Sequence, residues 1–298
     1  RNGFVFYGFS AYAGGLFFLF LFDCVFVSYL LIEARKATLF IDHDKLTTEV
    51  QTYLEKEQIR TKDYHELTLA LQEYDGNALL VNSSEMTHKV FNTLKSSSAV
   101  VGTSPIPAMK AIKNDTEIEG FKHAMLRDGI AMVKFLKWLK PAVEAGGQTE
   151  ISLEKKLTSL REEQDLFRGI SFDTIVGYEA HGAIVHYEAT PDTDIPVEPR
   201  GLVLIDSGAQ YQDGTTDITR TIALGDITEE QRRIYTLVLK GHIQLDLCKF
   251  PDGACGSQID AFARQAMWRE GYNFMHGTGH GVGSYLNVHE GPHQIRME

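Results

Sequence analysis

Apolar and polar positions divide the chain into two regions with different patterns of elements. Between residues 25 and 110, short apolar runs such as VFVSYLLIE and ATLFID alternate with amphipathic segments such as KLTTEVQTYLEKEQI. Short apolar runs between turn residues are typical of strands, and apolar residues every three to four positions are typical of helices. We therefore predict a small α/β domain over residues 24–110, which ends near the two prolines of SPIPAMKAIKND.

Residues 111–298 carry longer helical patterns and several strand-like segments. A helix is predicted from about 115 to 140, with Asn114 and Glu117 as a capping box and Pro141 as its end. Another is predicted at about 150–163, and two more begin at the capping pairs Thr228 with Gln231 and Ser257 with Asp260, the last of them ending at Gly271. The strand-like segments between them are FDTIVGYEA, GAIVHY, GLVLIDSGAQY, TDITRTIAL and GYNFMHGTGHGVG. This region is predicted to be α+β.

The first 23 residues form an atypical segment, rich in Phe and Gly and almost uncharged. Together with the next run they give a 20-residue apolar stretch, 13–32, which is long enough to span a bilayer. Asp23 would lie within such a span at a cost, so we expect an ordinary buried strand over 25–32 instead. A membrane-anchored protein remains the alternative interpretation of this stretch.

Charge and cysteine content narrow the possible functions. The net charge is −11, and because binding to nucleic acid requires a basic face, nucleic acid is not expected to be the main partner. The three cysteines, Cys24, Cys248 and Cys255, form no CxxC pair and are odd in number. This pattern favours a reducing, cytoplasmic location over a disulfide framework.

Two carboxylates in LIDSGAQYQDGTTDITRT suggest a metal site. The segment predicts a β-hairpin with its turn at QDG, so Asp213 is assigned to ordinary turn chemistry. In a hairpin with an even-length loop, paired positions have an odd sum; Asp206 and Asp217 meet this condition and should share a face. Two anions that close remain ionised together only beside a cation, and oxygen ligands suit Mn²⁺, Mg²⁺ or Zn²⁺. A solvated hairpin face is the alternative.

Four histidines lie in strand or glycine-rich contexts near the acidic hairpin. His276 and His280 belong to HGTGHGVG, where four glycines favour a loop or strand end over a zinc-protease helix. His289 follows in NVHEGP, and His186 lies upstream in AIVHY. A single histidine is usually a structural residue, but four of them beside two carboxylates favour metal binding and proton transfer.

These motifs, LIDSGAQYQDGTTDITRT, HGTGHGVGSYLNVHEGP and GAIVHY in this order, resemble the catalytic domain of the aminopeptidase P (Xaa-Pro aminopeptidase) family, which belongs to the pita-bread metallopeptidases. The resemblance extends over roughly residues 25–298. It implies a pita-bread catalytic domain over 111–298, preceded by a creatinase-like α/β domain over 24–110. It also implies a cytoplasmic homodimer.

The resemblance also implies a dinuclear, usually manganese, centre held by Asp206, Asp217 and His280. It implies that His186, His276 and His289 line the substrate pocket. The implied reaction removes an N-terminal residue that precedes proline, by attack of a metal-bridging hydroxide on the scissile carbonyl. Peptides with N-terminal Xaa-Pro are therefore the expected substrates.

The family pattern includes two further glutamate ligands that have no counterpart in this sequence. Glu290 and Glu298 are the only acidic residues after His280, and neither matches those positions. With three of five ligands present, we expect poor metal affinity. The expectation is that the catalytic domain is incomplete at its C-terminus and that this chain alone is inactive or is part of a longer gene product.

Two other interpretations involve the same fold. Prolidase, methionine aminopeptidase or creatinase activity would use the same metal site on a different substrate. Alternatively, the domain could be a non-catalytic module that binds a peptide or protein partner, although such modules usually lose the ligands that are kept here as Asp206, Asp217 and His280.

Overall fold

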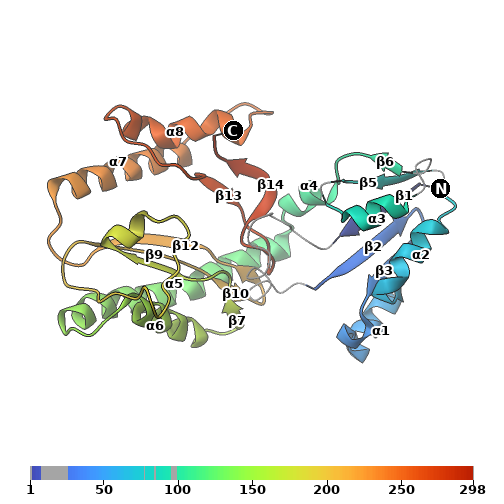
Figure 1. Cartoon of the computed structure of the whole chain (residues 1–298), viewed down its shortest axis with the longest axis horizontal. Helices are drawn as coiled ribbons and strands as arrows, with labels where there is room; N and C mark the ends of the chain where they lie inside the picture. The colour runs from blue at the N-terminus through green and yellow to red at the C-terminus, as the bar shows by residue number, and fades with distance from the viewer. Residues whose placement is uncertain (1, 8–25, 77, 84, 95–98, 298) are drawn as a thin grey trace. The chain divides into compact units, whose positions relative to one another are not determined.

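The computed structural model describes residues 2–7, 26–76, 78–83, 85–94 and 99–297. The described residues form two compact units, the first up to Ile106 and the second from Pro107 (Figure 1). Most of the predicted 1–23 segment, and the first part of the apolar stretch 13–32, lie outside the described residues.

The first unit is a six-stranded mixed sheet with helices. Its strands follow the order β4-β3-β2-β1-β5-β6, and the segments VFVSYLLIE and ATLFID, both predicted as strands, form the antiparallel pair β2–β3. Strand β1, within the N-terminal segment that we treated as atypical, lies between β2 and β5. The element bounds are β1 Asn2–Tyr7, β2 Ser28–Glu33, β3 Lys36–Ile41, α1 Thr48–Lys56, β4 Ile59–Lys62, α2 Leu67–Gln72, β5 Ala78–Val81, α3 His88–Thr93 and β6 Ala99–Val101.

The second unit combines five helices with three small sheets, among the residues that the structure describes, and confirms the α+β prediction. The sheets are β11-β10-β7, β12-β9-β8 and β13-β14. The helices are α4 Ile106–Ala111, α5 Asp115–Glu144, α6 Glu150–Glu162, α7 Glu229–Asp246 and α8 Gly256–Trp268. The strands are β7 Phe167–Ile170, β8 Ile175–Tyr178, β9 Leu202–Ser207, β10 Ala209–Tyr211, β11 Gly214–Thr215, β12 Ile218–Ala223, β13 Gly279–Gly281 and β14 Glu290–Ile295.

The main core of this unit lies between α5, α6 and the sheet β12-β9-β8 (Figure 1). It is filled by large apolar side chains with almost no exposure, among them Phe135, Leu139, Leu153, Leu157, Val203 and Ile205. Gly120 of α5 lets the helix touch the turn of the carboxylate hairpin, because a Cβ there would lie 2.0 Å from the carbonyl oxygen of Asp213. The hairpin therefore lies directly on the helical layer.

Helix boundaries agree with the predictions in two places and differ in three. The capping boxes of α5 and α7 are confirmed. Pro141 does not end α5, which continues to Glu144, because the last turn buries Val143 in the core. The N-cap of α8 is Cys255 with Gln258 and not Ser257 with Asp260, because the Asp260 carboxylate is buried in an ion pair with Arg264. Helix α8 also ends at Trp268, before Gly271.

Other predicted strands are shorter than their patterns suggested. GAIVHY is not a strand: Glu179–Ala183 form a 3₁₀ helix, which is followed by an irregular loop. In GYNFMHGTGHGVG, residues 271–283 and hereafter the histidine segment, only Gly279–Gly281 is a strand. Across the described part of the chain, no helix combines the length and the apolar content needed to cross a membrane.

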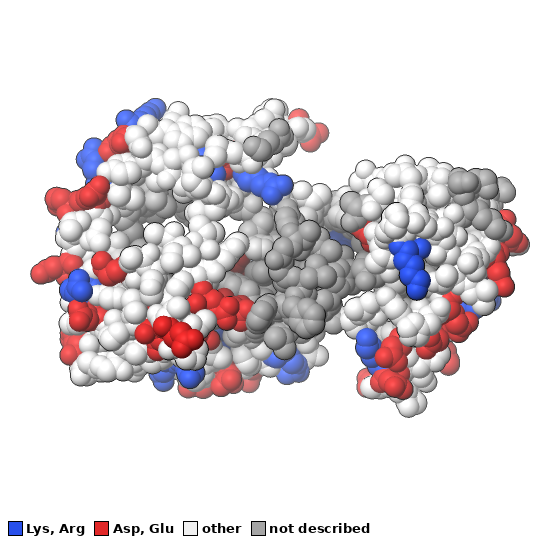
Figure 2. Space-filling view, viewed as in Figure 1, with Lys and Arg blue, Asp and Glu red and all other residues white. Residues whose placement is uncertain are grey.

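Acidic residues outnumber basic ones in the chain as a whole. On the face drawn in Figure 2, Asp and Glu side chains gather in clusters while Lys and Arg side chains are scattered. Forty acidic residues against 29 basic ones account for this balance. No basic face for a phosphate backbone appears in this view.

Candidate functional site

The hairpin β9–β12 places two carboxylates on one face. Thr219 lies directly opposite Asp206, and Tyr211 pairs with Gly214 in the same register across the turn. Asp217 precedes Thr219 by two residues, so it lies diagonally across from Asp206 on the same face. The observed register therefore places Asp206 and Asp217 on one face, as their spacing in the sequence predicted.

Asp206 is held in the middle strand of its sheet. It pairs with Thr219 of β12 on one side and with Ile175 of β8 on the other. Burial raises the pKa of the Asp206 carboxyl, with a further contribution from the negative charge of Asp217. A hydrogen bond from Thr219 and the nearby His186 and His280 act in the opposite direction. The Oδ1 atom of Asp206 is buried and has no hydrogen-bond partner.

His280 of β13 faces the second carboxylate. Its Nε2 atom lies 3.2 Å from Oδ2 of Asp217, and its Nδ1 atom lies 2.8 Å from the carbonyl oxygen of Gly281. The hydrogen bond to Asp217 raises the pKa of His280, against the opposing effect of burial. The imidazole is thus joined to the hairpin, which brings together residues 63 positions apart in the sequence (280 − 217).

Two further histidines complete the group around the carboxylates. The ring of His289 contacts that of His280 edge to face, with 4.1 Å between the centroids. Burial lowers the pKa of His289, and the neighbouring His280 and His186 lower it further. His186 is exposed, yet it is close enough to influence both Asp206 and His289 electrostatically.

His276 lies apart from this group. Its ring packs on Phe274 at a centroid distance of 4.8 Å, and its Nδ1 atom lies 2.8 Å from the carbonyl oxygen of Gly277. The residue is exposed. The structure thus brings five of the six candidate residues together and turns His276 to a different contact.

The chemistry of the gathered side chains fits a divalent cation. Carboxylates and imidazoles are ligands of Mn²⁺ and Zn²⁺. The Oδ1 atom of Asp206 is buried and accepts no hydrogen bond, and a cation would satisfy it. Among the described residues, no three His, Cys, Asp or Glu side chains already lie close enough together to enclose an ion. The donor types therefore fit, while the Asp217–His280 hydrogen bond takes up the space between two of the donors.

A buried ionic cluster beneath the hairpin was not predicted from the sequence. Arg161 of α6 donates to both carboxylate oxygens of Asp128 of α5, at 2.7 and 2.9 Å, and both side chains are fully buried. The Tyr211 hydroxyl donates to Oδ1 of Asp128 at 3.0 Å. Burial, with the adjacent carboxylate, raises the pKa of Tyr211, so its hydroxyl remains a donor. Arg127 pairs with Asp213 in the turn, which gives this turn residue a structural contact.

The histidine segment has a separate anchor, also missed by sequence reasoning. Arg264 of α8 is buried; its Nε lies 2.6 Å from Asp260, and it donates to the carbonyl oxygens of Phe274 and His276 at 2.5 and 2.9 Å. The guanidinium carbon lies 3.8 Å from the centroid of the Phe274 ring. The Thr278 hydroxyl donates to Asp260 at 2.5 Å. The Ser257–Asp260 spacing suggested a helix cap and thereby concealed this role.

Comparison with known families supports the arrangement. The model of metallopeptidase family M24 matches residues 119–297, which is more than half of the chain. The Creatinase/Prolidase N-terminal domain model matches residues 21–117. The two matches follow the same order as the two units of the structure.

Individual relatives show the same pattern. A probable Xaa-Pro aminopeptidase P of Arthroderma gypseum is 42% identical over 280 residues, which cover 90% of this chain and 44% of the relative. The chain spans less than half the length of the curated relatives it matches. An X-prolyl aminopeptidase of Caenorhabditis elegans, described as a cytosolic enzyme with a di-nuclear active site, has a TM-score of 0.86 at 37% identity, over 92% of this chain and 46% of its own.

A prolidase of Pyrococcus horikoshii has a similar fold. Its TM-score is 0.74 at 26% identity, over 98% of this chain and 80% of its own. The structural likeness alone thus extends to enzymes with different peptide substrates.

Proposed function

The chain belongs to metallopeptidase family M24, with a creatinase-type domain before a pita-bread unit, and on this basis we propose that it acts as an Xaa-Pro aminopeptidase. The proposed reaction releases the N-terminal residue from peptides with proline in second position. The observation that carries this proposal is that His280, from a distant segment, lies 3.2 Å from Asp217, on the hairpin face that Asp217 shares with Asp206. The relatives with about 40% identity are the reason for choosing this substrate class over others.

We assign the metal-binding role to Asp206, Asp217 and His280. Asp206 has a buried oxygen, Oδ1, without a hydrogen-bond partner. One oxygen of Asp217, Oδ2, contacts Nε2 of His280. When bound, two divalent ions, which we propose to be Mn²⁺, would supply Lewis acidity and lower the pKa of water. Loading requires His280 to release its proton, because only a neutral imidazole binds a metal.

The remaining histidines are assigned to the substrate. The lowered pKa of His289 favours the neutral ring near pH 7, where it can donate one hydrogen bond and accept another. His186 is exposed beside the carboxylates and is available to a peptide. His276 is proposed as a pocket residue on the family resemblance alone, because its contacts point to Phe274 and Gly277.

Metal affinity is the first test of the assignment. Each ion needs several anionic ligands, and the described residues bring only two candidate carboxylates to His280, so we expect weak Mn²⁺ binding and low activity of this 298-residue chain. Titration of Mn²⁺ followed by electron paramagnetic resonance measures the affinity directly. Asp206→Asn should lower it by about tenfold or more. Asp213→Asn, on the turn, is the matched control, and equal effects of the two substitutions would contradict the assignment.

Substrate class is tested by peptide cleavage with added Mn²⁺. Xaa-Pro-Yaa tripeptides should lose their first residue, while Xaa-Pro dipeptides and Met-Ala peptides should not. Cleavage of dipeptides alone would identify a prolidase and overturn the proposal. A chain that binds a proline peptide without cleaving it, and without binding metal, would instead be a binding module.

His289→Gln and His276→Gln form a matched pair for the pocket. His289 contacts His280 and His276 does not, so His289→Gln should reduce kcat/KM by about a hundredfold, a size typical for general acid–base groups. His276→Gln should have the smaller effect. The reverse order would show that the pocket is built around His276.

We further propose that residues 111–298 form the catalytic domain, and that the protein is a cytoplasmic homodimer. The location rests on the odd number of cysteines without a CxxC spacing and on the description of the Caenorhabditis elegans enzyme as cytosolic. Light scattering coupled to size-exclusion chromatography measures the oligomeric state, and a mass near 33 kDa at micromolar concentration would refute the dimer.

A further inference from the structure

Glu150, the first residue of α6, is a fully buried carboxylate that lies outside the candidate metal site. It accepts a hydrogen bond from the backbone N–H of Tyr178 at 2.8 Å and one from the Tyr187 hydroxyl at 2.9 Å. Nδ1 of His181 lies 3.0 Å from both of its oxygens. A carboxylate only accepts, so Nδ1 carries the hydrogen and the tautomer of His181 is set by this contact.

Two of these partners lie at the two ends of one short segment. The segment 181–187 begins at His181 and ends at Tyr187, and the two rings are stacked at a centroid distance of 4.5 Å. Between them the backbone turns twice, with Ile184 N–H donating to the carbonyl of His181 at 3.0 Å and Tyr187 N–H donating to that of Ile184 at 3.2 Å. Both ends of a seven-residue segment are thus held by one carboxylate.

The residues between the two ends point outward. Ile184 and Val185 are 53% and 55% exposed, so two adjacent apolar side chains lie open to solvent. His186 is exposed as well and has a φ of 57°, in the left-handed region that few non-glycine residues occupy. Such a conformation persists only where the surrounding structure enforces it.

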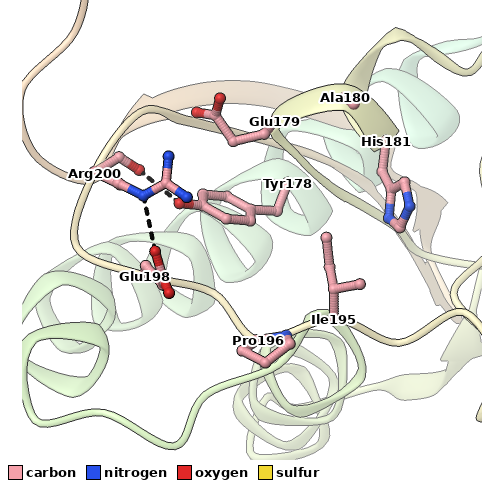
Figure 3. Close-up of a pocket in the computed structure, with 8 residues that line it drawn as sticks. All are labelled: Tyr178, Glu179, Ala180, His181, Ile195, Pro196, Glu198 and Arg200. Atoms are coloured by element: carbon pink, nitrogen blue, oxygen red, sulfur yellow. Dashed lines mark hydrogen bonds and ion pairs between the residues drawn. The ribbon is translucent and has the colours of Figure 1, made fainter.

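One end of the segment, at His181, borders a pocket. His181 borders an open pocket together with Ile195 and Pro196, while Glu198 and Arg200 lie at its other end (Figure 3). Arg200 is engaged with Glu198, and the Tyr178 hydroxyl donates to the carbonyl of Arg200. The side of His181 that faces this pocket is therefore free of packing, and the buried carboxylate fixes the ring from behind.

We propose that Glu150 is a positioning residue, which clamps His181 and Tyr187 so that Ile184, Val185 and His186 form a rigid face that contacts the peptide substrate. The proposal rests on the function proposed above. His186 already influences Asp206 and His289, so this face adjoins the carboxylate and histidine group. An apolar pair beside an imidazole suits a substrate with an apolar ring, such as proline, next to a polar peptide carbonyl.

The test compares two tyrosines with the same kind of hydrogen bond. Tyr187 and Tyr211 each donate a hydroxyl to a fully buried carboxylate, Glu150 and Asp128 respectively. Tyr187→Phe removes the Tyr187 hydrogen bond of the clamp, and Tyr211→Phe removes an equivalent bond under the hairpin. Hydrogen exchange of the whole chain, read by mass spectrometry, requires no activity and no metal.

In Tyr187→Phe, the amides of Ile184 and Tyr187 should exchange about tenfold faster or more, while those of β9 keep the wild-type rate. In Tyr211→Phe, the amides of segment 181–187 should keep the wild-type rate. Equal exchange of this segment in both variants and in the wild type would overturn the clamp. Glu150→Ala should exceed the effect of Tyr187→Phe, and Glu150→Gln, which keeps an acceptor, should restore part of the protection.

Peptide cleavage then connects the clamp to the substrate. In Tyr187→Phe, KM for an Xaa-Pro-Yaa tripeptide should rise about tenfold with a smaller change in kcat, because binding and not chemistry is impaired. A fall in kcat at unchanged KM would overturn the substrate-contact role. If the wild-type protein cleaves no peptide at Mn²⁺ concentrations that saturate it in the resonance titration, the proposed function fails, whereas hydrogen exchange still decides whether Glu150 orders the segment.

Discussion

The carboxylate hairpin and the histidine segment supply the two halves of the candidate site, but they are stabilised in different ways. Strands β9 and β12 are six residues each, and β9 is paired on both sides. Strand β13 has only three residues and is paired on one side. The position of the hairpin is fixed by backbone hydrogen bonds, whereas the position of the histidine segment depends on side chains, above all on Arg264.

This difference assigns different tasks to the two halves. A hairpin with one strand in the middle of its sheet keeps two like charges at a fixed separation despite their repulsion. The short strand β13 is paired only with β14, and its segment is bound by Arg264 and Thr278, so local opening there should disturb fewer contacts than opening of the hairpin. We infer that the carboxylates form the fixed part of the site and that the histidines form its adaptable part.

The largest expected effect comes from breaking the anchor of the hairpin. Asp128→Asn leaves Arg161 as a buried charge without a counterion, which typically costs about 3–5 kcal/mol of unfolding free energy. Because Asp128 links α5, α6 and Tyr211, the loss should affect the whole second unit. Urea denaturation followed by circular dichroism measures it. A change below about 1 kcal/mol would mean that the hairpin does not depend on this pair.

Removing the anchor of the histidine segment should have a comparable but more local effect. Arg264→Met leaves two carbonyls without their donor and the buried Asp260 without its cation, again for a loss of about 3–5 kcal/mol. Amide exchange should accelerate over 274–280 and stay slow in β9. Uniform acceleration in both regions would show that the two halves unfold together, against the comparison drawn above.

The link between the halves is tested by Asp217→Asn in the metal-free chain. The pKa of His280 is raised by Asp217, so the pair stabilises the fold below the ordinary histidine value of 6.5 and this contribution is lost as the pH rises through the raised pKa. The wild type should therefore be more stable than the variant at about pH 5.5, and the difference should vanish at alkaline pH.

The same variant offers a second measurement. Asp217 raises the pKa of Asp206 through its negative charge, so Asp217→Asn should lower the pKa of the Asp206 carboxyl. Nuclear magnetic resonance titration of the Asp206 and His280 side chains gives the pKa values of both. An unchanged pKa of Asp206 would place the carboxylates too far apart to share a cation.

The smallest effect is expected from an exposed ion pair on the same helix as Asp128. Lys134 of α5 pairs with Glu163 at 2.8 Å, and both side chains are about half exposed. Lys134→Ala should change the unfolding free energy by less than about 0.5 kcal/mol. A loss as large as that of Asp128→Asn would show that charge removal from α5, and not burial, determines the effect.

The sequence predicted the local features of the site well. The capping boxes and the shared face of Asp206 and Asp217 follow from short spacings, because helix caps and strand alternation are set by neighbouring residues. The sequence did not predict GAIVHY as a loop, because its alternating pattern is equally compatible with a strand.

The buried anchors could not have been predicted in this way. Asp128 meets Arg161 over 33 residues of sequence and Tyr211 over 83, and no spacing rule connects such positions. Charged residues in amphipathic helices normally face water, so Asp128 and Arg161 were indistinguishable from their exposed neighbours. Only the tertiary arrangement shows which charges are enclosed.

The unbroken register of the hairpin limits how this protein can diverge. Odd-numbered positions such as Ile205 and Tyr211 face the helices, and Asp206 emerges on the opposite side. Amino-acid replacements between 206 and 217 leave this alternation intact. A single-residue insertion or deletion in one strand moves every later side chain of that strand to the opposite face of the sheet. Homologues should therefore vary in the composition of this stretch while conserving its length, and tolerated gaps should occur in matched pairs across the two strands.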